Sequence, residues 1–394
     1  MRLSLRPFWR RGGQASDGAD APAFVDTVPM PITGPTPARH AAEQYEHALA
    51  RVAAEPSAPI ALAAAIPFCA AHCLYCEREV HVAQPADVID AYVGALLAEA
   101  RLLAGRIGTR HEVLQLHLGG GSANELGEVQ LVRLVDGLQE AWRMPADAEM
   151  SVECDPRRMS QGHFDLLRSL GFRLASLGVV DLDPAVQQAI GRRHSQALID
   201  DVCQVARESG FERINLELMI GLPMQTLPRW RATLERVIAM APDRVALARY
   251  HHRPQSVPVQ RALDASALPE EATCRDLWAL SAEMLCEAGY EAIGADQFVL
   301  PDDELALALR RGELRRNLVS YTATPNAALL GLGAGAVGEI GGSLFWSEAA
   351  LPLWQQSIGE GRLAVVRAQM APAASNAMAP LERGFERLGP RWLS

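Results

Sequence analysis

Three cysteines of this sequence, Cys69, Cys73 and Cys76, fall within eight residues and have the spacing Cys-x3-Cys-x2-Cys. They follow an apolar, strand-like run, so we expect them on a loop. Thiolates are the usual ligands of iron–sulfur clusters, and three at this spacing suit three corners of a [4Fe-4S] cubane. The fourth iron would then be open, and an open metal position is where chemistry takes place. The remaining cysteines stand singly in apolar segments, at Cys154, Cys203, Cys274 and Cys286.

Three other interpretations of the cysteine cluster stay open. A zinc site needs a fourth ligand at similar spacing, which His72 or His81 could supply. A disulfide is disfavoured because we expect no secretory signal and a reducing compartment, in which thiols stay free for metal. The third alternative is a chance cluster of inert thiols. We favour the iron–sulfur cluster over all three.

The composition is that of an ordinary soluble globular protein. Of the 394 residues, 49% are hydrophobic and 21% are charged, and the net charge is −10 with a pI of about 5.5. This acidic balance argues against a nucleic-acid partner. No apolar run approaches the ~20 residues that span a bilayer. The basic start of the chain lacks a following apolar core, so we expect a cytoplasmic protein without an export signal.

Short apolar runs alternate with amphipathic stretches along the middle of the chain. The expected strands are Ile60–Ile66, Val113–Leu118, Glu149–Cys154, Arg173–Val179, Arg213–Ile220 and Arg244–Tyr250. The expected helices between them are Val88–Leu103, Leu126–Trp142, Gly162–Leu170, Gln196–Ser209 and Arg229–Met240. Strands separated by helices of this length indicate repeated βαβ units. Six such units predict an α/β fold, a partial (β/α)6 TIM-like barrel.

We expect three parts in the chain. Residues 1–55 form an irregular amino-terminal segment with one helix, 56–298 form the barrel, and 299–394 form a small, mostly helical carboxyl-terminal extension. The extension contains a glycine-rich stretch, Leu330–Gly338. This stretch could bring backbone close to a ligand, or it could be a place where helices pack tightly.

Polar or glycine-rich residues recur where the expected strands end. In barrels of parallel strands, functional groups gather at the carboxyl ends of the strands. The cysteine loop follows the first strand, and Gly119–Ser122 follows the second. Glu153 and Asp155 close the third strand, Glu217 lies in the fifth, and His251 follows the sixth. The same rim of the barrel is therefore the expected site.

The cysteine loop, together with a glycine run after the next strand, resembles the radical S-adenosylmethionine (SAM) superfamily. Within it, the chain is similar to oxygen-independent coproporphyrinogen III oxidases from about Ile66 to Glu360. The similarity is closest in Glu153–Arg192, in Asn215–Thr226 and from Gly289 through Gly338. The resemblance implies a [4Fe-4S] cluster whose open iron chelates SAM, with a 5′-deoxyadenosyl radical as the product of SAM cleavage.

The resemblance also implies a SAM pocket. Its residues, at matching positions of this sequence, are Tyr75, Gly120, Gly121, Ser122, Glu153, Arg192, Glu217, His251 and Val337. In the family pattern, backbone at Gly120 and Gly121 meets the methionine amino group, and Ser122 takes the place of a threonine hydroxyl. Glu153 and Arg192 match a carboxylate and a guanidinium of the pocket, where arginine clamps a carboxylate bidentately.

The sequence departs from the family pattern at several positions. The Tyr and His of the Tyr-x-His-x-Pro-Phe-Cys lead-in are replaced by Ala63 and Ala65. Arg78 replaces a fourth cysteine, and Val180 replaces a glutamine, which removes a donor and an acceptor from the pocket. Glu217 replaces an aspartate that would hold ribose hydroxyls, yet it can still accept hydrogen bonds.

Three further positions concern the adenine end and the length of the chain. Tyr75 matches an aromatic position beside the adenine, and His251 replaces a small residue near the adenine. Val337 replaces an isoleucine later in the pattern. The family's amino-terminal Arg-Tyr-Thr-Ser-Tyr-Pro-Thr signature has no match. The carboxyl-terminal extension is shorter than that of the family.

The function implied by the resemblance is oxidative decarboxylation of coproporphyrinogen III to protoporphyrinogen IX in porphyrin biosynthesis. The implied partners are a tetrapyrrole-type substrate and an electron donor such as flavodoxin or ferredoxin, and we expect a monomer. One alternative is the same chemistry on another substrate, because fold and cofactor do not fix substrate. The other is a non-catalytic protein of haem trafficking that binds a cluster or haem, with His72, His251 or His252 as axial ligands.

Overall fold

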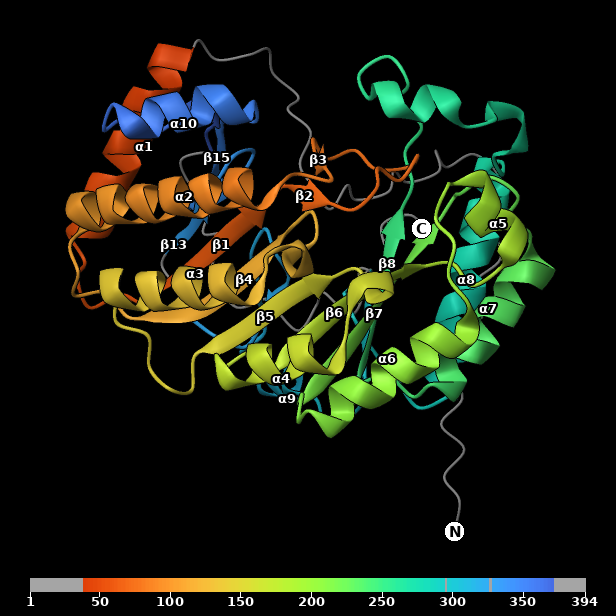
Figure 1. Cartoon of the computed structure of the whole chain (residues 1–394). Helices are drawn as coiled ribbons and strands as arrows, with labels where there is room; N and C mark the ends of the chain where they lie inside the picture. The colour runs from red at the N-terminus through yellow and green to blue at the C-terminus, as the bar shows by residue number, and fades with distance from the viewer. Residues whose placement is uncertain (1–37, 295, 326–327, 372–394) are drawn as a thin grey trace, which may run out of the picture.

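The computed structural model describes residues 38–294, 296–325 and 328–371 (Figure 1). Most of the predicted irregular amino-terminal segment and the last 23 residues, 372–394, lie outside the described residues. The expected helix of the amino-terminal part is α1 (Ala38–Ala53). The described chain forms one twelve-stranded sheet, of order β16-β15-β14-β13-β1-β4-β5-β6-β7-β8-β10-β9, with helices packed on it.

The centre of the sheet is the predicted α/β repeat. Its six strands run parallel: β1 (Ile60–Ile66), β4 (Val113–Gly120), β5 (Glu149–Cys154), β6 (Leu174–Val180), β7 (Arg213–Ile220) and β8 (Arg244–Arg249). The helices between them are α2 (Ala86–Ile107), α3 (Glu128–Ala141), α4 (Gln161–Ser169), α5 (Pro184–Ala189), α6 (Gln196–Glu208) and α7 (Leu227–Ala239). In Figure 1, α2, α3, α4 and α6 cover one face of these strands. The expected partial barrel is confirmed.

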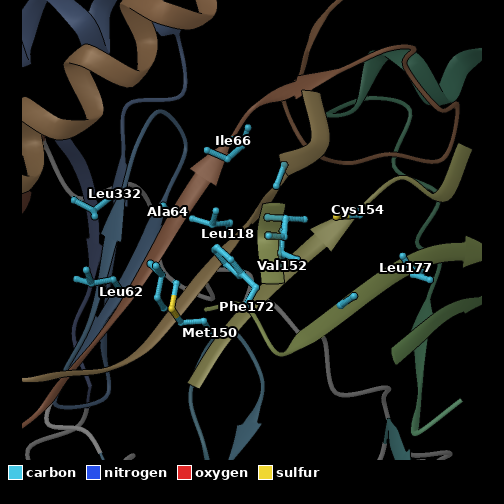
Figure 2. Close-up of a cluster of buried hydrophobic side chains, with 14 of the residues drawn as sticks. Leu62, Ala64, Ile66, Leu118, Met150, Val152, Cys154, Phe172, Leu177 and Leu332 are labelled. Atoms are coloured by element: carbon cyan, nitrogen blue, oxygen red, sulfur yellow. The ribbon is translucent and has the colours of Figure 1, made fainter. Parts of the chain in front are cut away.

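Alternation along the strands separates an apolar face from a polar one. Successive side chains of a strand point to opposite faces, so every second residue shares a surface. Figure 2 shows one surface packed with apolar side chains, at Leu62, Ala64, Ile66, Leu118, Met150, Val152, Cys154, Phe172, Leu177 and Leu332. These pack with apolar residues of the covering helices into one core. The alternate positions carry His117, Glu153 and Glu217, so the inner surface of the partial barrel is polar.

The carboxyl-terminal extension continues the sheet beyond β1. Strand β13 (Ala328–Leu332) pairs parallel with β1, and three antiparallel strands follow it. These strands are β14 (Val337–Ile340), β15 (Ser343–Ser347) and β16 (Val365–Gln369). Helix α10 (Leu351–Gly359) precedes β16 and packs with α1 against α2 on the left of Figure 1.

One prediction about this extension is wrong. Its described part contains more strand than helix, so it is not mostly helical. The glycine-rich stretch is the β13–β14 connection with its flanking strands, and its turn contacts α2 through Gly333 and Ala334. Short strands rich in glycine and alanine lack the period-2 side-chain pattern by which strands are recognised. The division of the chain at residue 298 stays a prediction, since the sheet continues across it.

The other edge of the sheet is built from residues after β8. Helix α8 (Glu271–Glu287) leads to β9 (Glu291–Ile293) and β10 (Gln297–Val299), and β10 pairs antiparallel with β8. Helix α9 (Glu304–Arg311) and a two-stranded ladder, β11 (Arg315–Arg316) with β12 (Tyr321–Thr322), follow. Across the described ranges, none of the helices has the length and apolar character needed to cross a membrane.

Candidate functional site

A cavity of about 640 Å³ opens at the carboxyl ends of the parallel strands. All twelve site residues predicted from the sequence line it: Cys69, Tyr75, Cys73, Cys76, Gly120, Gly121, Ser122, Glu153, Arg192, Glu217, His251 and Val337. They come from segments spread over most of the described chain, and the strand ends bring them to one place. A second hollow, over α1, α10 and β16, contains none of these residues. The ligand roles of the twelve residues stay predictions.

The cysteine loop is fixed at both ends. Strands β2 (Phe68–Cys69) and β3 (His81–Val82) pair with each other and enclose the loop, and the His81 amide donates to the Pro67 carbonyl at 2.7 Å. In the middle of the loop, the Leu74 amide donates to the Ile190 carbonyl at 3.1 Å. This last bond brings the loop next to the segment that carries Arg192.

The three thiols suit a cationic metal group. All are free, with Cys73 buried and Cys69 and Cys76 half-buried. Burial, together with the neighbouring Cys76 and Cys73, raises the pKa of Cys69 to about 12. Burial also raises the pKa of Cys76. Crowded, desolvated thiolates need positive charge among them, which iron supplies on binding.

The placement of the three thiols fits an iron–sulfur cluster. In the part of the chain that the structure describes, no three His, Cys, Asp or Glu side chains converge as ligands of one metal ion do. In a cubane each thiolate binds a different iron, so the three sulfurs surround a common space instead of one point. Cys69, Cys73 and Cys76 around one cavity fit that arrangement.

The glycine run lets β4 approach the cysteine loop. A Cβ atom on Gly121 would lie 2.5 Å from the Ile66 carbonyl oxygen and 2.8 Å from that of Phe68, so a side chain is excluded there. The Ser122 amide donates to the same Phe68 carbonyl at 2.9 Å. The Ser122 hydroxyl is buried and donates to Asn124 Oδ1 at 2.6 Å, so it also braces the loop after β4.

Two carboxyl groups stand on the polar inner surface. Glu153 accepts hydrogen bonds from His117 Nε2 at 3.2 Å and from the Gly120 amide at 3.0 Å, and His117 Nδ1 lies 2.9 Å from the Ser151 hydroxyl. Glu217 accepts a hydrogen bond from the Ser176 hydroxyl at 2.5 Å. His117 was not predicted as a site residue. Its position two residues before Gly119 nevertheless puts it on the same face of β4 as Gly119.

Arg192 is held in place by Asp155. Its guanidinium pairs with the Asp155 carboxylate at 3.2 Å, donates to the Gly178 carbonyl, and reaches to 3.5 Å from Cys73 Sγ. Asp155 also pairs bidentately with Arg157, at 2.6 Å for the shorter contact. Burial alone would raise the pKa of Asp155, but the two guanidinium groups hold it below its usual value. The sequence placed Asp155 at this rim without giving it a role.

Parts of the cavity wall have structural features that the sequence did not indicate. Val180, at the position of the family glutamine, lines the cavity with φ of 72°, a backbone conformation that β-branched residues rarely adopt. Val337 pairs with Trp346 of β15, and Trp346 and Trp278 also line the cavity. The antiparallel extension thus supplies part of the cavity wall.

Comparisons with known proteins agree with this geometry. Residues 65–237 match the Radical SAM superfamily. The oxygen-independent coproporphyrinogen III oxidase of Salmonella typhimurium is 37% identical over 320 residues, which cover 81% of this chain and 70% of that protein. The Escherichia coli K12 enzyme of the same name is 37% identical over 316 residues, 79% of this chain and 68% of its own.

The solved structure of coproporphyrinogen III oxidase from Escherichia coli, described as a radical SAM enzyme, superposes with a TM-score of 0.79 at 34% identity. The superposition covers 84% of this chain and 75% of that chain. The fold and the cysteine-lined cavity are those of a radical SAM protein, a class that uses a [4Fe-4S] cluster and SAM. The chain belongs to the oxygen-independent coproporphyrinogen III oxidase family.

Proposed function

We propose that this chain is a radical SAM oxidoreductase of porphyrin biosynthesis that decarboxylates coproporphyrinogen III oxidatively. The reaction converts propionate side chains to vinyl groups and gives protoporphyrinogen IX. The family relationship supports the substrate class. The observation that carries the proposal is the meeting of all twelve predicted residues in one cavity at the strand ends.

Different residues of the cavity would bind the two cofactors. Cys69, Cys73 and Cys76 would hold the [4Fe-4S] cluster. When bound, the cluster and SAM supply a 5′-deoxyadenosyl radical, which abstracts a hydrogen atom from the substrate. Glu153, kept ionised by its hydrogen-bond donors, provides negative charge for the SAM amino group. Arg192, steered by Asp155, provides the fork for the SAM carboxylate.

The charges around the cavity suit a tetrapyrrole that carries both acidic and donor groups. Guanidinium groups line it at Arg78, Arg157, Arg192, Arg249, Arg253 and Arg316. Carboxyl groups line it at Glu77, Glu79, Glu153, Asp155, Glu217 and Asp296. Coproporphyrinogen presents propionate carboxylates that guanidinium groups can bind, and pyrrole N–H groups that donate to carboxylates. Trp278 and Trp346 add apolar area for the macrocycle.

The remaining proposals concern the surroundings of the enzyme. Flavodoxin or ferredoxin is the proposed electron donor, because the cluster must receive an electron before SAM is cleaved. Free thiols at the cavity support a reducing compartment, and the cytoplasm is the one we propose. The proposed monomer is tested by the mass of the reconstituted protein in light scattering.

One experiment tests the function directly. The protein is reconstituted with iron and sulfide under anaerobic conditions, reduced with dithionite and given SAM and coproporphyrinogen III. The expected result is 5′-deoxyadenosine together with protoporphyrinogen IX, and neither with Cys73→Ala. Nucleoside without decarboxylated product would favour another substrate. An intact cluster that yields no nucleoside would favour the non-catalytic alternative.

A further inference from the structure

Two buried polar residues of α2 lie behind the cavity wall. Tyr92 is fully buried, and its hydroxyl donates to the Ala65 carbonyl at 2.6 Å. Glu99 is 3% exposed and accepts a hydrogen bond from the indole N–H of Trp354 in α10 at 3.3 Å. The two residues are seven positions apart and so lie on one face of the helix. Burying such groups is costly unless they are fully bonded, so their partners matter.

Their partners are consecutive amides of the β13–β14 turn. Glu99 Oε2 accepts from the Gly333 amide at 2.6 Å, and the Tyr92 hydroxyl accepts from the Ala334 amide at 3.2 Å. Each of these donors would otherwise be a buried N–H without a partner, which costs about 1–3 kcal/mol in general. The turn is therefore fixed to α2 through two adjacent backbone bonds.

The turn is also pressed closely onto Tyr92. Gly333 has φ of +101°, a conformation open to glycine. A Cβ atom at this position would lie 2.3 Å from the Tyr92 hydroxyl oxygen and 2.9 Å from the Ala65 carbonyl oxygen. The position of the turn is thus set by contact as well as by hydrogen bonds.

The other side of this assembly is the cavity. Ala65, Ala334 and Gly335 all line it, as does Val337 at the start of β14. Ala65 is the penultimate residue of β1, just before the cysteine loop. The Tyr92 ring packs edge-on against Phe68 of that loop, with ring centroids 5.1 Å apart. One helix face therefore holds two walls of the cavity, the cysteine loop and the β13–β14 turn.

We propose that Tyr92 and Glu99 are positioning residues that set the SAM affinity of the cavity by fixing the Gly333–Gly335 turn against the end of β1. The proposal rests on the proposed function, since it takes SAM as the ligand of the cavity. Neither residue reaches the ligand itself. Removal of the hydrogen-bond partners behind metal ligands typically costs about 10- to 100-fold in affinity or activity. By analogy, we expect about tenfold for SAM here.

The test compares Tyr92→Phe and Glu99→Gln with a matched control, Tyr290→Phe. The Tyr290 hydroxyl is also buried and also donates to a backbone carbonyl at 2.6 Å, that of Pro242, but at the opposite edge of the sheet. Iron and sulfide contents are measured first, and SAM affinity is then measured by calorimetry on the reconstituted proteins. Hydrogen exchange of the 328–340 segment is followed in the same proteins without SAM.

The expected result is faster exchange in that segment and about tenfold weaker SAM binding for both α2 variants, at unchanged cluster content. Tyr290→Phe should show neither change. Unaltered exchange in the turn would overturn the proposal, and so would faster exchange with unaltered affinity. Failure of the wild-type protein to bind SAM would refute the proposed function, while the exchange data would still decide whether the two side chains hold the turn.

Discussion

Glu153 and Glu217 face the same cavity from β5 and β7, yet their surroundings shift their acidities in opposite directions. Burial acts to raise the pKa of Glu153, but the hydrogen bond from His117 and that from the Gly120 amide lower it overall. Burial raises the pKa of Glu217, and the negative charge of Glu153 raises it further. Like charges in one desolvated site cannot both ionise easily, so the pair is arranged to carry one charge before the other.

The first prediction concerns SAM binding by this pair. Glu153→Gln removes the carboxylate that is ionised first and should weaken SAM binding by about 10- to 100-fold, the range of a charge-assisted hydrogen bond. Glu217→Gln should change the affinity much less, because the raised pKa of Glu217 makes it the second carboxyl group of the pair to ionise. Calorimetry on the reconstituted proteins measures both affinities. Equal losses for the two variants would contradict the assignment of charge to Glu153.

The second prediction concerns the cluster. Cys73→Ala should abolish the brown chromophore and reduce bound iron and sulfide, because the cubane would lose one of its three protein ligands. Cys286→Ala is the matched control, since that thiol is exposed on α8 and far from the cavity lining. Iron and sulfide analysis after anaerobic reconstitution provides the measurement. Full cluster content in Cys73→Ala would refute the ligand set.

The third prediction concerns the guanidinium near Cys73. Arg192→Lys keeps the positive charge but loses the planar fork that contacts Asp155 and Gly178. We expect SAM affinity to fall about tenfold or more, with iron content retained. Arg193→Lys makes the same replacement at the adjacent, exposed position and should leave SAM affinity unchanged. Similar SAM affinities for wild type, Arg192→Lys and Arg193→Lys would mean that Arg192 does not clamp the SAM carboxylate.

The parallel strands at the centre of the sheet could be predicted because the sequence patterns that identify them are local. β1, β5 and β7 have the predicted bounds, since each is a short apolar run between turns. The strands of the carboxyl-terminal extension were not predicted. The first of them, β13, is held in the sheet by parallel pairing with β1, which is distant in sequence, and not by its own side-chain pattern. Tertiary contacts of this kind override local propensity.

Site residues that match a known motif were predictable from the sequence. Residues that contact or support those motif residues were not. Asp155 and His117 contact predicted residues but lie outside the motif positions from which the site was predicted. Tyr92 and Glu99 lie on α2, whose sequence signal is its repeat of apolar residues. A glutamate on the buried face of a helix is a signal in itself, because buried carboxyl groups require partners.

The fourth prediction concerns Val180, a β-branched residue at φ of 72° in the cavity wall. Val180→Gln should strengthen SAM binding by up to about tenfold, because it restores a donor and an acceptor to the pocket. Glutamine also lacks the β-branch that strains this backbone conformation. Val180→Leu is the matched control, since it removes the branch without adding polar groups. Equal gains in the two variants would attribute the effect to strain instead of hydrogen bonding.

The fifth prediction concerns Glu99 and pH. Burial raises its pKa from 4.5 to about 7, although the Gly333 amide and the Trp354 indole act in the opposite direction. The other titratable groups facing it are the hydroxyls of Tyr45 in α1 and Tyr92, whose pKa values are raised by burial and by Glu99. A carboxyl group with a raised pKa stabilises the fold fully below pH 4.5 and loses that contribution as the pH rises through 7.

Glu99→Gln cannot ionise, so its stability should not fall in this way. Relative to wild type, its free energy of unfolding should rise by about 3 kcal/mol between pH 5 and pH 8, since one pKa unit corresponds to about 1.4 kcal/mol. Urea unfolding at several pH values measures this difference. Glu235→Gln, at an exposed position of α7, serves as the control and should track wild type at every pH. A constant difference between Glu99→Gln and wild type would show that the pKa of Glu99 is not raised in the folded protein, and that its carboxylate is already ionised at pH 5.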